Sequence, residues 1–145
     1  HRLWEYFLVE SLDFKWDQVH DIAEQLEHID SDELVEKLDA HLNYPKFDPH
    51  GDPIPDKDGN FIEQDKILLS DAQYREDLYI VGVKDSSSTF LKYLEKKRLS
   101  LGTLVKVIEQ EEFDQSLNVE VNGQSLQLSA MAAKNIYVQL KKQSK

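Results

Sequence analysis

The sequence predicts an α+β chain in which a small helical domain is followed by a small antiparallel β-barrel. Three observations lead to this class. Apolar residues recur at helical spacing over the first 43 residues, all four prolines gather in residues 44–72, and from residue 76 onward the pattern changes to short strands. We therefore expect two domains, residues 1–72 and residues 73–145, with the proline-rich segment connecting them.

Three short helices are expected in the first domain. Residues 2–11 and residues 31–43 each carry apolar side chains along one face, and Asp30 is the expected N-cap of the latter helix. Residues 14–28 form the second helix, with Asp13 as its expected N-cap. Because each helix is only half polar, a dimer would bury more of their apolar faces than a monomer can.

The second helix places four possible metal ligands on one side. Their positions i, i+4, i+7 and i+8 fall on neighbouring rows of a helix face. They provide oxygen and nitrogen ligands without sulfur, a set that suits Mn²⁺, Fe²⁺ or Zn²⁺. The alternative is a charged face that is simply solvated in an acidic protein. The four residues are His20, Glu24, Glu27 and His28.

Five short strands and one helix are expected in the second domain. Asn122-Gly123 separates two alternating segments and is a strong signal for a β-hairpin. Five strands within about 65 residues indicate a small closed barrel. The expected strands are residues 78–83, 103–108, 117–121, 124–128 and 135–140, with a helix at residues 88–97.

Composition excludes several classes of protein. The 145 residues carry a net charge of −11, and residues 1–75 alone hold 7 Lys/Arg against 19 Asp/Glu, so this chain by itself is a poor nucleic-acid binder. With no cysteine, disulfides and thiolate metal sites are excluded, which fits a cytoplasmic protein. No apolar run is long enough for a membrane span.

Four ordered motifs in the first 55 residues resemble the diphtheria toxin repressor family, and most closely its manganese-responsive branch from streptococci and related bacteria. Residues 76–145 are similar to that family's SH3-like, FeoA-type domain. The motifs are His1-Arg2-Leu3-Trp4-Glu5, Val19-His20-Asp21, Glu24-x-x-Glu27-His28 followed by Ser31-Asp32, and Pro49-His50-Gly51-x-Pro53-Ile54-Pro55.

The resemblance implies two metal sites. The primary, activating site would use Glu24, Glu27 and His28, and the glutamate at the first position, where iron-type members have cysteine, favours a hard cation. The ancillary site would link the helical domain to the barrel. Its ligands would be Glu5, Asp48, His50 and Asp85, with His20 as a weaker candidate. His1 matches a histidine that is a ligand in some members and is a further weaker candidate.

The function that the resemblance implies is the metal-sensing and dimerisation portion of a Mn²⁺- or Fe²⁺-dependent transcriptional repressor that controls metal-ion homeostasis. We expect a homodimer, Mn²⁺ as the cofactor with Fe²⁺ as the alternative, Zn²⁺ or other divalent ions in vitro, and no membrane partner. Operator DNA would be bound only through an N-terminal winged-helix domain that is absent from this chain.

Two other functions stay open at this point. The first is a metalloenzyme, although the Glu-x-x-His spacing of carboxylate bundles is broken and no nucleophile or phosphate-loop motif is present, so we expect no enzyme. The second is a non-catalytic interaction module whose SH3-like barrel binds peptides. Its five candidate aromatic residues are Tyr79, Phe90, Tyr93, Phe113 and Tyr137.

Overall fold

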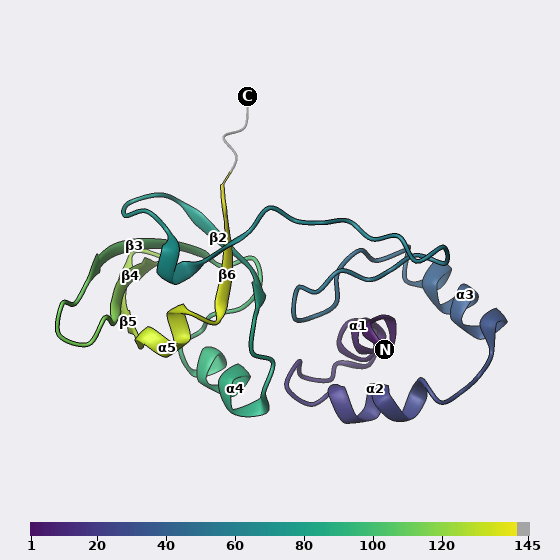
Figure 1. Cartoon of the computed structure of the whole chain (residues 1–145). Helices are drawn as coiled ribbons and strands as arrows, with labels where there is room; N and C mark the ends of the chain where they lie inside the picture. Colours follow the sequence, from purple (N-terminus) through teal and green to yellow (C-terminus); the bar gives the residue numbers. More distant parts are fainter. Residues whose placement is uncertain (142–145) are drawn as a thin grey trace. The chain divides into compact units, whose positions relative to one another are not determined.

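The chain forms two compact units in the computed structural model, which describes residues 1–141 (Figure 1). The first unit comprises residues 1–64, and the second begins at Asp65. This boundary lies before the one expected between residues 72 and 73, because residues 67 and 68 already pair with the last strand of the sheet.

The first unit contains the three helices that hydrophobic periodicity predicts. They are α1 (Arg2–Leu12), α2 (His20–Leu26) and α3 (Asp32–His41). Their apolar faces meet in one core built from Trp4, Leu8, Val19, Ala23 and Leu38. This core holds α1 beside α2. The candidate metal ligands that these two helices carry are thereby brought near each other.

The extent of the second helix, its N-cap and the N-cap of the third helix were predicted wrongly. The helix covers only His20–Leu26 of the expected residues 14–28. Asp13 does not begin it, because Asp13 adopts the left-handed conformation (φ 62°) and is the C-cap of α1. At α3 the N-cap is Ser31 rather than Asp30, since the Ser31 hydroxyl accepts a hydrogen bond from the Leu34 N–H.

A tight turn follows α3 in the proline-rich segment. Phe47 and Pro53 form an isolated antiparallel bridge. Between them, one Asp48 carboxylate oxygen accepts the backbone N–H groups of His50 and Asp52, both at 2.9 Å. Gly51 has φ 90°, a conformation that favours glycine. The turn therefore fixes Asp48 and His50 relative to each other.

The second unit is a six-stranded antiparallel sheet with the order β1-β6-β2-β3-β4-β5. In Figure 1 the sheet curves, and α4 and α5 lie near each other in this unit. Its strands are β1 (Ile67–Leu68), β2 (Leu78–Val83), β3 (Leu104–Gln110), β4 (Leu117–Val121), β5 (Gln124–Leu128) and β6 (Ile136–Leu140). The short helices are η1 (Leu69–Asp71), α4 (Ser88–Lys96) and α5 (Ala130–Ala133).

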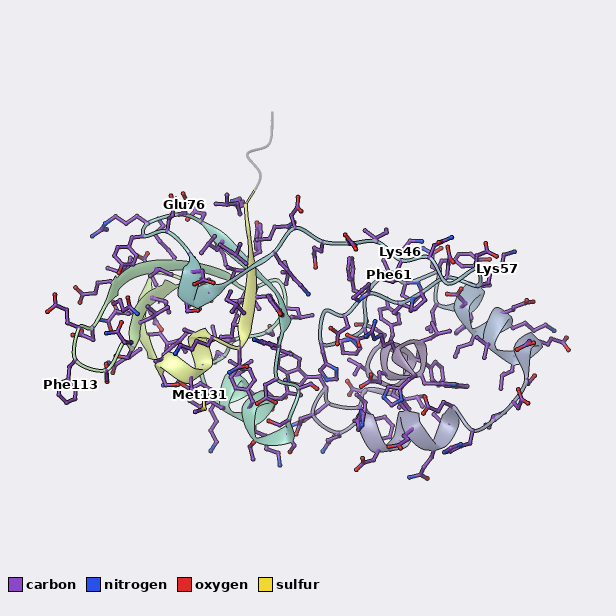
Figure 2. All side chains as sticks on the ribbon, viewed as in Figure 1. Lys46, Lys57, Phe61, Glu76, Phe113 and Met131 are labelled. Carbon is purple, nitrogen blue, oxygen red and sulfur yellow. The ribbon has the colours of Figure 1, made fainter. Side chains whose placement is uncertain are left out.

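The predicted β4–β5 hairpin is confirmed, with Asn122 and Gly123 both at positive φ as the two-residue turn requires. Alternate residues of β2 and β4 point into the core, among them Leu78, Ile80 and Val119. Phe113 projects from the loop between β3 and β4 and is 98% exposed (Figure 2). Every helix within residues 1–141 is too short or too polar to cross a membrane.

Arg98 strains the end of α4. The Leu99 N–H donates to the Leu94 carbonyl and the Arg98 N–H to the Glu95 carbonyl, a Schellman pattern in which the left-handed position is usually glycine. Arg98 occupies it with φ 60°. Arg98→Gly should therefore stabilise the second unit by about 0.5–1 kcal/mol, the relieved strain exceeding the added chain entropy.

Amide hydrogen exchange of Val105 and Val119 would measure this change, because both residues are buried in the sheet. Lys97→Gly is the matched control. Lys97 has φ −85°, so glycine there relieves no strain and should destabilise the unit by about 0.5–1 kcal/mol. Equal effects of the two substitutions would contradict the interpretation.

Candidate metal centre

Three buried ionisable side chains meet in the first unit, and we call them the buried triad: Glu5, Asp48 and His50. They are 3%, 4% and 5% exposed, and one ligand atom of each lies within 4.8 Å of the others. Glu5 is buried because its neighbours Trp4 and Leu8 turn the same part of α1 toward the core. Asp48 and His50 come from the tight turn, so two segments distant in sequence build the triad.

The contacts of His50 leave one ring nitrogen free to bind a cation. Its Nε2 lies 2.7 Å from the Trp16 carbonyl oxygen, which can only accept, so Nε2 carries the proton. The His50 ring also stacks on the Trp16 indole, with centroids 6.2 Å apart. Its Nδ1 faces Glu5 Oε2 at 3.6 Å. A carbonyl that orients a histidine in this way is typical of metal-binding histidines.

The electrostatics of the buried triad favour a cation. Burial raises the pKa of the Asp48 carboxyl to about 6. Burial also raises the pKa of Glu5, and the nearby His50 and His20 oppose this effect. Within the described residues, Glu5 Oε2 is buried without a hydrogen-bond partner. Two desolvated carboxylates beside one imidazole are unfavourable alone, and a divalent cation would compensate them.

The weaker candidates His1 and His20 lie on the other side of Glu5. His1 Nε2 is 3.5 Å from Glu5 Oε1 and 3.1 Å from His20 Nδ1. His1 Nδ1 lies 3.0 Å from Glu27 Oε2. These contacts bring together residues from α1 and the two ends of α2.

The predicted primary ligands are not gathered in one group. Glu24 lies on α2 and is exposed, whereas Glu27 and His28 follow the last residue of that helix. Glu24 instead groups with His20 and Asp21, whose ligand atoms lie within 4.8 Å of one another. Asp21 was not among the ligands predicted from the sequence, although its i, i+3 spacing to Glu24 indicates that the two lie next to each other on a helix.

Asp85 belongs to the second unit, where it is exposed and follows β2. One of its carboxylate oxygens accepts the Ser87 N–H at 2.8 Å, and Ser87 is the N-cap of α4. Its membership of the ancillary site stays a prediction.

Comparison with known proteins agrees with this arrangement of domains. Residues 1–56 match the iron dependent repressor metal binding and dimerisation domain, and residues 67–140 match the FeoA domain. A solved manganese-dependent transcriptional repressor in complex with manganese is 35% identical with a TM-score of 0.89; the similarity covers 97% of this chain and 67% of that one. ScaR with bound Zn²⁺ is 38% identical with a TM-score of 0.83, over 97% of this chain and 70% of ScaR.

Curated relatives match a smaller part of this chain. The iron-dependent repressor IdeR of Mycobacterium tuberculosis (strain H37Rv) is 40% identical over 55 residues, which are 38% of this chain and 24% of IdeR. A probable metal transport system membrane protein of Chlamydia trachomatis is 49% identical over 55 residues, 38% of this chain and 12% of that protein. The matches thus span a quarter or less of these relatives' length.

Two domain matches in the same order, and solved repressors aligned over nearly the whole chain, confirm the predicted resemblance. The chain belongs to the diphtheria toxin repressor family of iron- and manganese-dependent repressors, of which it carries the metal binding and dimerisation domain followed by a FeoA domain.

Proposed function

We propose that this chain is the sensing and dimerising part of a Mn²⁺-activated repressor, with Fe²⁺ as the alternative metal. The observation that carries this proposal is the buried triad, whose Glu5 oxygen lacks a hydrogen-bond partner within the described residues. A carboxylate-rich site with one imidazole and no sulfur suits a hard cation better than a thiolate-selective one. The solved relatives include a manganese complex.

Both predicted sites remain part of the proposal. Glu5, Asp48 and His50 would hold the ancillary ion, and Asp85 would add a ligand from the second domain. Glu24, Glu27 and His28 would form the primary site together with residues of a DNA-binding domain outside this chain. The division between residues 1–64 and the unit that begins at Asp65 would then separate sensing and dimerisation from the FeoA-type domain.

The chain's own residues would link metal occupancy to conformation. When bound, the ion would supply the positive charge that compensates the buried carboxylates of Glu5 and Asp48. His50 connects this site to the segment before α2 through the Trp16 carbonyl, so the tight turn and that segment are ordered together. Metal binding by the primary-site residues would favour one position of the DNA-binding domain. This would shift the equilibrium between positions that the domain already adopts.

Homodimer formation is supported by apolar side chains left exposed on the helices. Leu12 is 53% exposed, and Leu34 and Val35 are each 40% exposed. A second copy would cover them, and a two-fold dimer would present two DNA-binding domains to operator DNA in the cytoplasm.

The rival functions have less support. The Chlamydia transport protein matches only 38% of this chain, whereas the solved manganese-dependent repressor aligns over 97% of it. The aromatic residues of the peptide-binding alternative are dispersed. Phe113 lies in the β3–β4 loop (Figure 2), while Phe90 and Tyr93, both on α4, stack on each other. Family members are repressors, and we propose that this chain is not an enzyme.

Mn²⁺ binding by equilibrium dialysis tests the buried triad. Asp48→Ala/His50→Ala should weaken the tightest site by more than about 100-fold, because loss of a supporting outer partner alone weakens metal binding by roughly 10–100-fold. The control is Asp32→Ala/His41→Ala, which replaces an exposed aspartate and histidine of α3. Equal binding by the two double variants would contradict the proposed site.

A further inference from the structure

Phe113 is the most exposed of the large apolar side chains in residues 65–141. It is 98% exposed and projects from the loop between β3 and β4 (Figure 2). We call residues 111–116 the acidic loop, because three of them are acidic. Among these, Glu112 is exposed and forms no ion pair within the described residues. An exposed aromatic ring beside a free carboxylate is suited to an apolar pocket with a positive rim.

Hydrogen bonds hold the acidic loop in one shape. The Glu111 N–H donates to the Ser116 carbonyl at 2.8 Å, and the Gln115 N–H donates to the Glu111 carbonyl at 2.9 Å. One Asp114 carboxylate oxygen accepts the Ser116 N–H at 3.0 Å and the Ser116 hydroxyl at 2.7 Å. Phe113 is therefore already positioned when a partner arrives, which reduces the conformational entropy lost on binding.

A pocket of complementary character lies between the end of α4 and the β4–β5 turn, and we call it the basic-rimmed pocket. Its volume is about 250 Å³, whereas a cavity of about 150 Å³ already holds benzene, so a phenyl ring fits. Val121 and Leu126 give it apolar walls, and Lys97 and Arg98 give it two positive charges. None of the described residues that line it is acidic.

The Arg98 guanidinium is the group of this pocket that is left to bind an anion. Lys97 Nζ donates to the Gln127 carbonyl at 3.2 Å and lies 5.5 Å from the centre of the Tyr93 ring. Arg98 is exposed and, in the part of the chain that the structure describes, forms no ion pair. Its backbone is held at φ 60°, and strained residues of this kind cluster at binding sites.

The acidic loop cannot reach the basic-rimmed pocket of its own chain. The strand β4 begins at Leu117, directly after the loop, and ends at Val121 in the pocket wall. Five residues of a strand span about 16 Å. Because the loop is closed by its own hydrogen bonds, Phe113 can enter this pocket only in another molecule. A second copy of the chain carries the matching surface.

We propose that Phe113 of one copy docks into the basic-rimmed pocket of a second copy, with Glu112 paired to Arg98 across the contact. The contact joins two different surfaces, so it is heterologous and does not close into a two-fold dimer. It therefore differs from the proposed homodimer contact of the helices and would link one dimer to the next. A single loop in a pocket buries less than about 1,200 Å², which is typical of weak, transient interfaces.

The test is a dilution series of the 145-residue chain followed by ¹⁵N-edited NMR. Amide signals of the acidic loop and of the basic-rimmed pocket should shift together as the concentration changes. Phe113→Ala should weaken this association by about 10-fold or more, as removal of a central anchor does. Met131→Ala is the matched control, because Met131 is another exposed apolar residue of the second unit (Figure 2). It should change nothing, and neither truncation touches the core.

An exchange of charges tests the pairing of Glu112 with Arg98. Glu112→Arg alone and Arg98→Glu alone each place like charges at the contact, so each variant should associate about 10-fold or more weakly than the wild type. An equimolar mixture of the two variants should restore the association, because the loop of the first then meets the pocket of the second with opposite charges. Restoration in the mixture also shows that both variants are folded.

Three results would overturn the proposal: signals that do not depend on concentration, association that Phe113→Ala leaves unchanged, or a mixture that associates no better than its components. If the chain does not self-associate but a peptide of residues 110–117 shifts the pocket signals, the occupant is a loop of another protein and the contact between copies fails. All these measurements are made without metal, so each failure leaves the proposed metal-sensing function intact.

Discussion

Asp48→Asn is expected to stabilise the metal-free first unit at pH 7 by up to about 3 kcal/mol. Burial raises the pKa of Asp48 from 3.8 to about 6, and this difference corresponds to roughly 3 kcal/mol of unfavourable free energy when the carboxylate is charged. An asparagine oxygen can still accept the His50 and Asp52 N–H groups. Its uncharged amide could also donate to Glu5 Oε2. Urea denaturation followed by Trp fluorescence measures the first unit alone.

The pH dependence of the stability of the first unit tests the sign of the Asp48 contribution. Because the folded-state pKa is above the unfolded one, the Asp48 contribution to stability is fully present below about pH 4 and is lost as the pH rises through about 6. Burial of Glu5 acts in the same direction. The Asn variant should therefore lose less stability between pH 4 and pH 7 than the wild type. An unchanged pH slope would contradict this account.

Saturating Mn²⁺ should reverse the order of the two proteins. At a free concentration of 1,000 times Kd, ligand binding stabilises the folded state by about 4.1 kcal/mol, which exceeds the expected advantage of the variant. The wild type should gain this stabilisation, whereas Asp48→Asn, which lacks one of the two buried carboxylates, should gain much less. The same substitution would thus improve the metal-free fold and impair the metal site.

The second large effect is expected at the proposed primary site. In the full-length repressor, Glu24→Ala or His28→Ala should weaken Mn²⁺-dependent DNA binding by about 100-fold or more, while metal-free binding stays unchanged. Both side chains are exposed, so their removal should leave the helical core intact. Fluorescence anisotropy with a labelled DNA fragment selected by the wild-type protein measures the response to Mn²⁺.

Controls on α3 separate metal binding from general loss of charge. Glu36→Ala and His41→Ala remove an exposed carboxylate and imidazole outside every cluster of possible ligands found in residues 1–141. These variants should respond to Mn²⁺ like the wild type. A normal metal response in Glu24→Ala would refute the primary-site assignment and would leave the buried triad as the remaining candidate.

Much of the fold follows from local sequence alone. The β4–β5 hairpin is determined by alternation on both sides of Asn122-Gly123, and α4 by the apolar positions between Ser88 and Lys96. Where local contacts determine an element, the spacing of its apolar residues and the residues of its turn were sufficient to predict it. The α+β class and the two-domain order of the family follow from the same patterns.

Other features were decided by tertiary contacts. The strand β1 is only two residues long and exists because it pairs with β6, about 70 residues away, so no local pattern could reveal it. Asp13 has the residue type of an N-cap, yet its left-handed backbone ends α1 and shortens the following helix. Cap identity depends on backbone angles as well as on residue type.

The sequence by itself determined which residues could bind a metal, because ligand chemistry is a property of the side chain. Only the tertiary structure decided which of them share a buried environment. Glu5 lies more than 40 residues from Asp48 and His50, and their contact depends on the packing of α1 against the tight turn. The Trp16 carbonyl that orients His50 belongs to the backbone, and its direction is set by the folded chain rather than by the identity of the residue.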